Sequence, residues 1–189
     1  MTHIFTAAST ATAVPPAAGA PDGFRPVAGP DAVHLAVHDA RRAAHYYCAT
    51  LALPCTAYSG PETGDPETVG YVFQCGPTRY VLTSVLQVLT DRGRRLADHL
   101  DRYGEGVTDL VLDVPDGYAA YDYAVDRGAH PITEPYELTD RYGTVVLAAV
   151  GAPGGLRHTL VERTAYSGPY LPGYLPVPPE LRPPTGSLV

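Results

Sequence analysis

The sequence has little of what several classes of protein require. Its three cysteines form no Cys-x-x-Cys pair and no His cluster accompanies them at zinc-finger spacing, so neither a disulfide framework nor a structural zinc site is expected. Lys and Arg number 13 against 20 Asp and Glu. This balance argues against nucleic acid as a partner, because phosphate binding depends on clustered positive charge. No apolar run is long enough to cross a bilayer, so no membrane partner is expected either.

The cysteines and the two ends of the chain suggest a cytoplasmic protein with one folded domain. We interpret Cys48, Cys55 and Cys75 as reduced thiols in or near the core. Residues 1–24 are rich in Ala, Thr and Pro and lack the charged and apolar regions of a signal peptide, so we expect a disordered segment there. Residues 166–189 are Pro-rich, which favours an extended linker or, as a weaker alternative, a PxxP ligand. The domain is expected over 25–165.

Between these ends the sequence reads as a duplication. Alternating apolar residues predict a strand over 32–38, and Asp39 is a favourable N-cap for the helix that follows. The pattern A-A-x-x-Y recurs at 43–47 and 119–123, which predicts two βαβββ modules at about 30–88 and 105–164. The remaining strands are expected near 56–59, 69–75, 80–86, 106–114, 131–136, 144–150 and 157–163, with further helices over 91–103 and after Asp116.

Several segments resemble a known family. They are A-Y-S-G-P-E at 57–62, Y-V-L-T-S-V at 80–85, H-L-D-R-Y-G-E-G-V at 99–107, E-P-Y-E-L at 134–138, G-T-V-V-L-A-A at 143–149 and H-T-L-V-E-R at 158–163. Together they resemble the N-terminal domain of bacterial 4-hydroxyphenylpyruvate dioxygenase and, less closely, hydroxymandelate synthase. The resemblance implies the vicinal oxygen chelate fold, which is glyoxalase-like. This is an α+β domain whose two βαβββ modules form one cupped, eight-stranded mixed sheet with helices outside.

The resemblance also implies where the chemistry of the family lies. The full-length enzyme is a non-haem Fe(II) dioxygenase of tyrosine catabolism that converts 4-hydroxyphenylpyruvate to homogentisate. Its two His and one Glu ligands lie in the C-terminal domain, beyond the last residue of this sequence. We therefore assign no catalytic, cofactor-binding or metal residue to this chain and expect no cofactor from it alone. The residues that would separate the dioxygenase from the hydroxymandelate-forming branch would lie in the same C-terminal domain.

The first and fifth strands carry polar side chains on one face. Period-two geometry groups Ala32, His34, Ala36 and His38, and likewise Val107, Asp109, Val111 and Asp113. By the resemblance, His34 and Asp109 correspond to the two His ligands of the catalytic half, and Thr159 falls on the Glu position. One hypothesis is a weak or vestigial metal site, completed by His38 or water. The alternative, which the chemistry favours, is a hydrogen bond between buried His34 and Asp109.

Other candidate motifs lack the context that their chemistry needs. Ser59, Ser84 and Ser167 lie in no G-x-S-x-G elbow. The glycines at 104–106 and 151–155 lack the strand-turn-helix setting of a phosphate loop. Five tyrosines at helical spacing are interpreted as core and helix-cover residues, namely Tyr46, Tyr47, Tyr118, Tyr121 and Tyr123.

These observations leave two functions open. In the first, the chain is the non-catalytic half of a dioxygenase, inactive alone, with a C-terminal catalytic half or a second copy as its partner; a separately encoded half could restore catalysis. In the second, it is a stand-alone binding protein whose cupped sheet holds a small aromatic or hydrophobic ligand.

Overall fold

The computed structural model describes residues 24–152 and 156–183. The expected N-terminal segment 1–24 lies almost wholly outside these residues. The first module runs β1 (Gly29–Ala36), α1 (Ala40–Leu51), β2 (Cys55–Ser59), β3 (Thr68–Cys75) and β4 (Thr78–Val85). The second runs β5 (Gly106–Asp113), α3 (Gly117–Asp126), β6 (His130–Asp140), β7 (Gly143–Gly151) and β8 (Arg157–Glu162). Helix α2 (Asp91–Tyr103) joins the modules, and β9 (Leu175–Pro176) follows the second.

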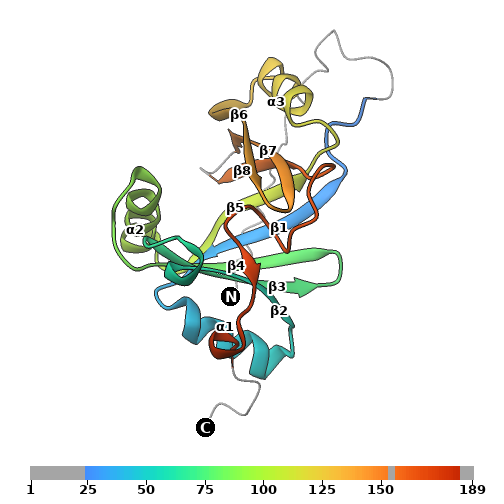
Figure 1. Ribbon diagram of the computed structural model, residues 1–189. Coiled ribbons are helices and arrows are strands. Elements are labelled where there is room, and N and C mark those ends of the chain that lie inside the picture. Colours follow the sequence, from blue (N-terminus) through green and yellow to red (C-terminus); the bar gives the residue numbers. More distant parts are fainter. Residues whose placement is uncertain (1–23, 153–155, 184–189) are drawn as a thin grey trace, which may run out of the picture.

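The strands form one mixed, curled sheet in the order β6-β7-β8-β5-β1-β4-β3-β2-β9 (Figure 1). Each module pairs its first and last strands in parallel, β1 with β4 and β5 with β8, and its remaining strands antiparallel. The modules meet at the antiparallel pair β1–β5. The predicted α+β architecture and the duplication are confirmed. The strand count differs from the predicted eight, because β9, in the expected linker, pairs with β2 and covers that edge.

The two module helices begin in the same way. Asp39 accepts a hydrogen bond from the backbone N–H of Arg42 at 2.9 Å, and Asp116 accepts one from Ala119 at 2.9 Å. These carboxylates satisfy amides that the first helical turn leaves free. Ala44 and Cys48 of α1, and Ala120 and Tyr121 of α3, then lie buried against the sheet. The capping residues therefore set where each helix starts, and the buried residues mark the face that meets the strands.

The sheet separates two layers of apolar packing. On the outer face, each module helix packs on the strands of its own module. Helix α1 packs on Tyr58, Tyr71 and Phe73, and α3 packs on β7 and β8. On the inner face, Val72, Val81, Val111 and Val161 pack together with Tyr170, which lies beyond β8. Residues 166–183, where the sequence predicts a linker, lie against the sheet in this structure: the inner-face cluster takes in Tyr166, Leu171 and Tyr174, and the outer one Val177 and Leu181.

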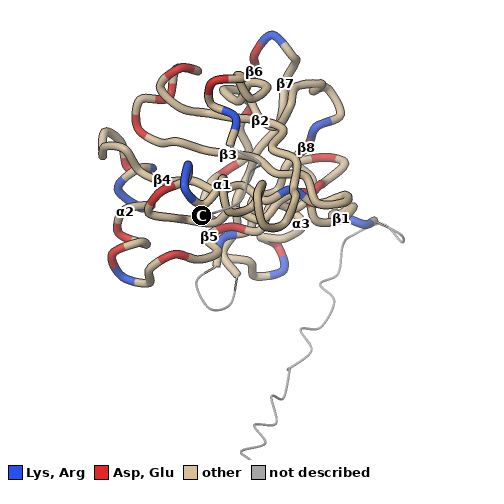
Figure 2. The backbone as a smooth tube through the Cα atoms, turned by 90° about the horizontal axis from the view of Figure 1, so that it is seen from below, with Lys and Arg blue, Asp and Glu red and all other residues tan. Residues whose placement is uncertain are grey.

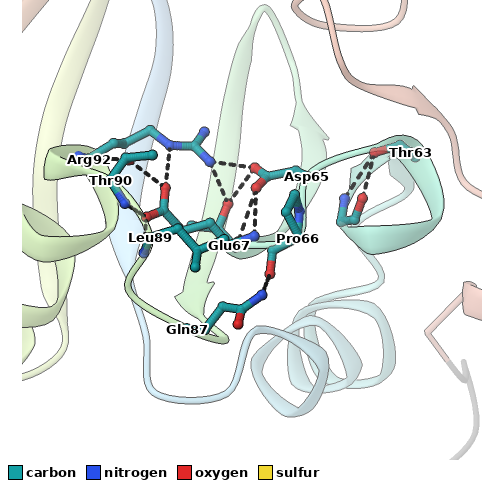
Figure 3. Close-up of polar contacts among 10 residues, drawn as sticks. Thr63, Asp65, Pro66, Glu67, Gln87, Leu89, Thr90 and Arg92 are labelled. Carbon is teal, nitrogen blue, oxygen red and sulfur yellow. Dashed lines mark hydrogen bonds and ion pairs between the residues drawn. The ribbon is translucent and has the colours of Figure 1, made fainter.

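Helix α2 is fastened to the first module by a buried carboxylate (Figure 3). Glu67, just before β3, accepts hydrogen bonds from the amides of Leu89 and Thr90 and from the Thr90 hydroxyl, at 2.6–2.9 Å. Arg92 bridges Glu67 at 3.4 Å and Asp65 at 2.6 Å. Burial alone would raise the pKa of Glu67, but these hydrogen bonds and the charge of Arg92 outweigh it and lower the pKa to about 2. The network fixes the start of the helix that links the modules.

Charged residues of both signs are spread over the fold. The backbone tube shows basic and acidic positions interspersed over the described chain (Figure 2).

The exposure of some cysteines and tyrosines differs from expectation. All three cysteines are free, and Cys48 is buried, but Cys75 is exposed at the end of β3 rather than near the core. Tyr121 is buried as predicted, whereas Tyr46 and Tyr118 are about half exposed. In the described residues, no helix has both the length and the apolar character that crossing a membrane takes.

Candidate functional site on the inner face

His34 and Asp109 lie directly opposite each other where the two modules meet. The pairing of β1 with β5 places their Cα atoms in register. Alternation along each strand turns both side chains to the inner face, with Ala32 and Val111 as their apolar neighbours in the core. The predicted equivalence of the two positions is therefore seen in the strand register.

The expected hydrogen bond between His34 and Asp109 is wrong, because each side chain finds another partner. His34 Nε2 lies 2.6 Å from the hydroxyl of Tyr170, 136 residues away in sequence. Burial lowers the pKa of His34, although the charges of Asp109 and Asp31 act to raise it. A neutral imidazole nitrogen can either donate to or accept from a phenol, so the bond between His34 Nε2 and the Tyr170 hydroxyl can form in either tautomer.

Asp109 is held by β8 instead. The Thr159 hydroxyl donates to one carboxylate oxygen at 2.5 Å and its backbone N–H donates to the other at 3.0 Å. The guanidinium of Arg157 lies 3.3 Å from the same carboxylate. The positions that the resemblance aligned with a His ligand and the Glu ligand thus bind each other. Their polar groups are satisfied without a metal ion.

A second polar cluster lies beside this one. Asp31 is 6% exposed and accepts from Arg79 at 2.5 Å and from Arg163 at 2.9 and 3.1 Å. Arg163 also donates to the backbone carbonyl of Tyr170. The two guanidinium carbons lie 5.9 and 5.0 Å from the centroid of the Tyr170 ring. Because a buried charge is costly unless it is paired, this cluster depends on strands β1, β4 and β8 and the segment after β8 being assembled together.

These residues do not fit Fe(II), the metal that the resemblance implies for the family. The described chain contains no group of three or more His, Cys, Asp and Glu suited to holding a metal ion. The imidazole of His34 is bound by Tyr170, and Asp109 by Thr159 and Arg157. His38 is exposed and its backbone N–H bonds Glu105 at 2.8 Å. The geometry therefore supports no step through a metal at this place.

Tyr170 is the residue that sequence reasoning missed. Its surroundings S-G-P-Y-L-P read as linker by composition, and no period marks a core position. Yet Tyr170 is 1% exposed, and burial raises its pKa well above the ordinary value. The conspicuous signal was the density of tyrosines after β8, at 166, 170 and 174, because large aromatic residues favour burial over a solvated linker.

Sequence relatives cover most of the chain. It is 37% identical over 147 residues to 4-hydroxyphenylpyruvate dioxygenase from Dictyostelium discoideum. That alignment covers 77% of this chain and 39% of that protein. It is 36% identical over 164 residues to a probable 4-hydroxyphenylpyruvate dioxygenase 2 from Aspergillus fumigatus, at 77% and 40% coverage. The chain thus spans about two fifths of the length of the curated relatives it matches. No family model matches the chain.

Solved structures agree on the fold. A mutant of 4-hydroxymandelate synthase from Streptomyces coelicolor superposes with a TM-score of 0.70 at 26% identity, covering 86% of this chain and 45% of that one. Methylmalonyl-CoA epimerase from Mycobacterium tuberculosis gives 0.54 at 21% identity, with 72% and 88% coverage, and so shares the fold alone. The vicinal oxygen chelate fold expected from the sequence is confirmed.

Proposed function

We propose that this chain, a homologue of the N-terminal half of the 4-hydroxyphenylpyruvate dioxygenases, serves as the non-catalytic half of such an enzyme in tyrosine catabolism. In this role it packs on and supports an iron-binding half and does no chemistry itself. The observation that carries the proposal is the extent of the match, about four fifths of this chain but only two fifths of each relative. Fold alone would not support a function, because chemistry depends on the site.

The inner face supports the same role. His34, Asp109 and Thr159, at the positions aligned with the ligands of the catalytic half, are engaged by Tyr170 or by one another. An open 2-His-1-carboxylate face would instead leave coordination positions for an oxo acid and oxygen. The iron of the proposed enzyme would be held by the other half, where the family places its ligands.

Oxygen uptake tests the proposal. The chain alone, supplied with Fe(II), ascorbate and 4-hydroxyphenylpyruvate, is expected to consume no oxygen beyond a metal-only control, and the D. discoideum relative serves as the positive control. A chimera joining this chain to the part of that relative beyond the matched region should then turn over. Turnover by the chain alone would contradict the proposal, as would a folded, iron-loaded chimera without activity.

A further inference from the structure

The turn between β4 and α2, with the sequence L-Q-V-L at 86–89, exposes three large apolar side chains. Leu86 is 53%, Val88 45% and Leu89 58% exposed. A single exposed apolar residue is common on protein surfaces, but several of them close together mark a place where another surface binds. The turn ends at Thr90, the N-cap of α2, so it lies beside the helix that joins the two modules.

The backbone of this turn is fixed, although its side chains are exposed (Figure 3). The amides of Leu86 and Gln87 donate to the backbone carbonyl of Glu67 at 2.9 and 3.3 Å. Beyond Val88, the amide of Leu89 donates to the carboxylate of the same residue at 2.9 Å. Because a turn that is already ordered loses less entropy when it binds, these apolar side chains are preorganised for contact with a partner.

The size of this apolar surface distinguishes between possible partners. Charged side chains of both signs follow it, namely Asp91, Arg92 and Arg94, all more than half exposed. A small apolar centre with a polar border is usual for an interface that is not obligate. A stable dimer of free chains needs about 20–30 residues on each side, more than the turn and its border supply. Two domains joined in one chain need less, because the linker raises their effective concentration.

The curated relatives contain such a joined partner. The 4-hydroxyphenylpyruvate dioxygenase of D. discoideum matches 77% of this chain with only 39% of its own length. More than half of that relative therefore lies outside the match, within the same chain as the segment that resembles this protein. The small apolar surface fits a partner of that kind better than it fits a second copy.

We propose that the turn 86–89 is the docking surface through which this chain packs on the iron-binding half, which presents an apolar surface to Leu86, Val88 and Leu89. The inference rests on the proposed function and adds to it the place where the two halves meet. Glu67 is then a positioning residue: its carbonyl and carboxylate hold the turn in the shape that docks.

Thiol labelling tests whether the second half covers the turn. Cys75→Ser first removes the exposed thiol. Val88→Cys and its control Ile132→Cys, at positions that are 45% and 46% exposed, are then compared in the chain alone and in the chimera with the D. discoideum relative. Iodoacetamide should alkylate Val88→Cys about tenfold more slowly in the chimera, because it reaches the thiol only when the halves separate. Ile132→Cys should react at the same rate in both.

The outcomes separate the docking surface from the proposed function. Unchanged labelling of Val88→Cys in a chimera that turns over would overturn the docking surface and leave the proposed function intact. Equal slowing of Val88→Cys and Ile132→Cys would overturn it too, because the turn would then not be specific. A folded, iron-loaded chimera without turnover would contradict the proposed function, and the docking surface with it.

The chain alone tests the other possible occupants of this surface. Labelling of each variant is referred to its rate in urea, and Val88→Cys is expected to be no more protected than Ile132→Cys. Protection of Val88→Cys that disappears on dilution would assign the turn to a second copy of the chain. Protection that persists on dilution would assign it to residues 1–23. Either result would overturn the proposal.

A serine variant keeps the proposal testable if Val88→Cys does not fold. In the chain alone, Leu89→Ser and Ile132→Ser should both leave the melting temperature nearly unchanged, because both positions are exposed. In the chimera, Leu89→Ser should lower the melting temperature more than Ile132→Ser does, since it removes apolar area buried between the halves. Equal melting temperatures of these two variants in the chimera would overturn the proposal.

Discussion

His34 and Asp109 are Cα partners on β1 and β5, yet His34 bonds Tyr170 at 2.6 Å and Asp109 bonds Thr159 at 2.5 Å. Equivalent positions of the two modules have thus acquired different partners. Asp109 is satisfied within its own module, through β8. His34 depends on a residue beyond both modules, so the segment after β8 is part of the inner-face core.

The bond between His34 and Tyr170 should contribute measurably to stability. Tyr170→Phe keeps the ring but removes the hydroxyl, which leaves a partly buried imidazole nitrogen without its partner. We expect a loss of about 1–2 kcal/mol in the free energy of unfolding, the usual cost of an unsatisfied buried group. Urea denaturation measures it, with Tyr103→Phe as the control at an exposed position. Equal midpoints for the two variants would mean that the hydrogen bond adds nothing.

The same pair should make stability depend on pH. Burial lowers the pKa of His34 below 6.5. The carboxylates of Asp109 and Asp31 act to raise this pKa, whereas the positive charges of Arg157 and Arg163 lower it further. A lowered histidine pKa means that the unfolded chain takes up the proton first. This contribution to stability is therefore full above about pH 6.5 and is lost as the pH falls through the lowered pKa.

Denaturation midpoints between pH 5 and 8 measure this dependence. The difference between the unchanged chain and His34→Gln should shrink as the pH falls, and His38→Gln controls for the loss of an exposed imidazole. A difference that grows toward acid pH would contradict the assigned direction of the pKa shift.

Replacing Gly93 of α2 with alanine should lower the stability of the chain, although this substitution normally stabilises helices. Alanine usually gains about 1 kcal/mol over glycine inside a helix. Here its Cβ would lie 2.2 Å from Glu67 Oε1, an oxygen already fixed by the amides of Leu89 and Thr90. We expect Gly93→Ala to destabilise the chain by about 1–2 kcal/mol in thermal or chemical unfolding. A stabilised variant would show that Glu67 can move without loss.

Local patterns were enough to predict most of the fold. The recurring A-A-x-x-Y, the acidic N-caps Asp39 and Asp116 and the alternation in 32–38 each concern residues a few positions apart. Their consequences, a helix start and a buried face, are local as well. The positions of His34 and Asp109 on neighbouring strands follow from the duplication.

No local pattern predicted that residues 166–183 lie against the sheet. Pro-rich composition favours an extended backbone, and an extended backbone can lie in solvent or on a sheet equally well. The residues of this chain dictate two βαβββ modules, because caps and periodicity act between near neighbours. That Tyr170 lies over the inner face was settled by folding in three dimensions: the imidazole and guanidinium groups that contact it converge only when β4, β1, β5 and β8 are assembled in one sheet.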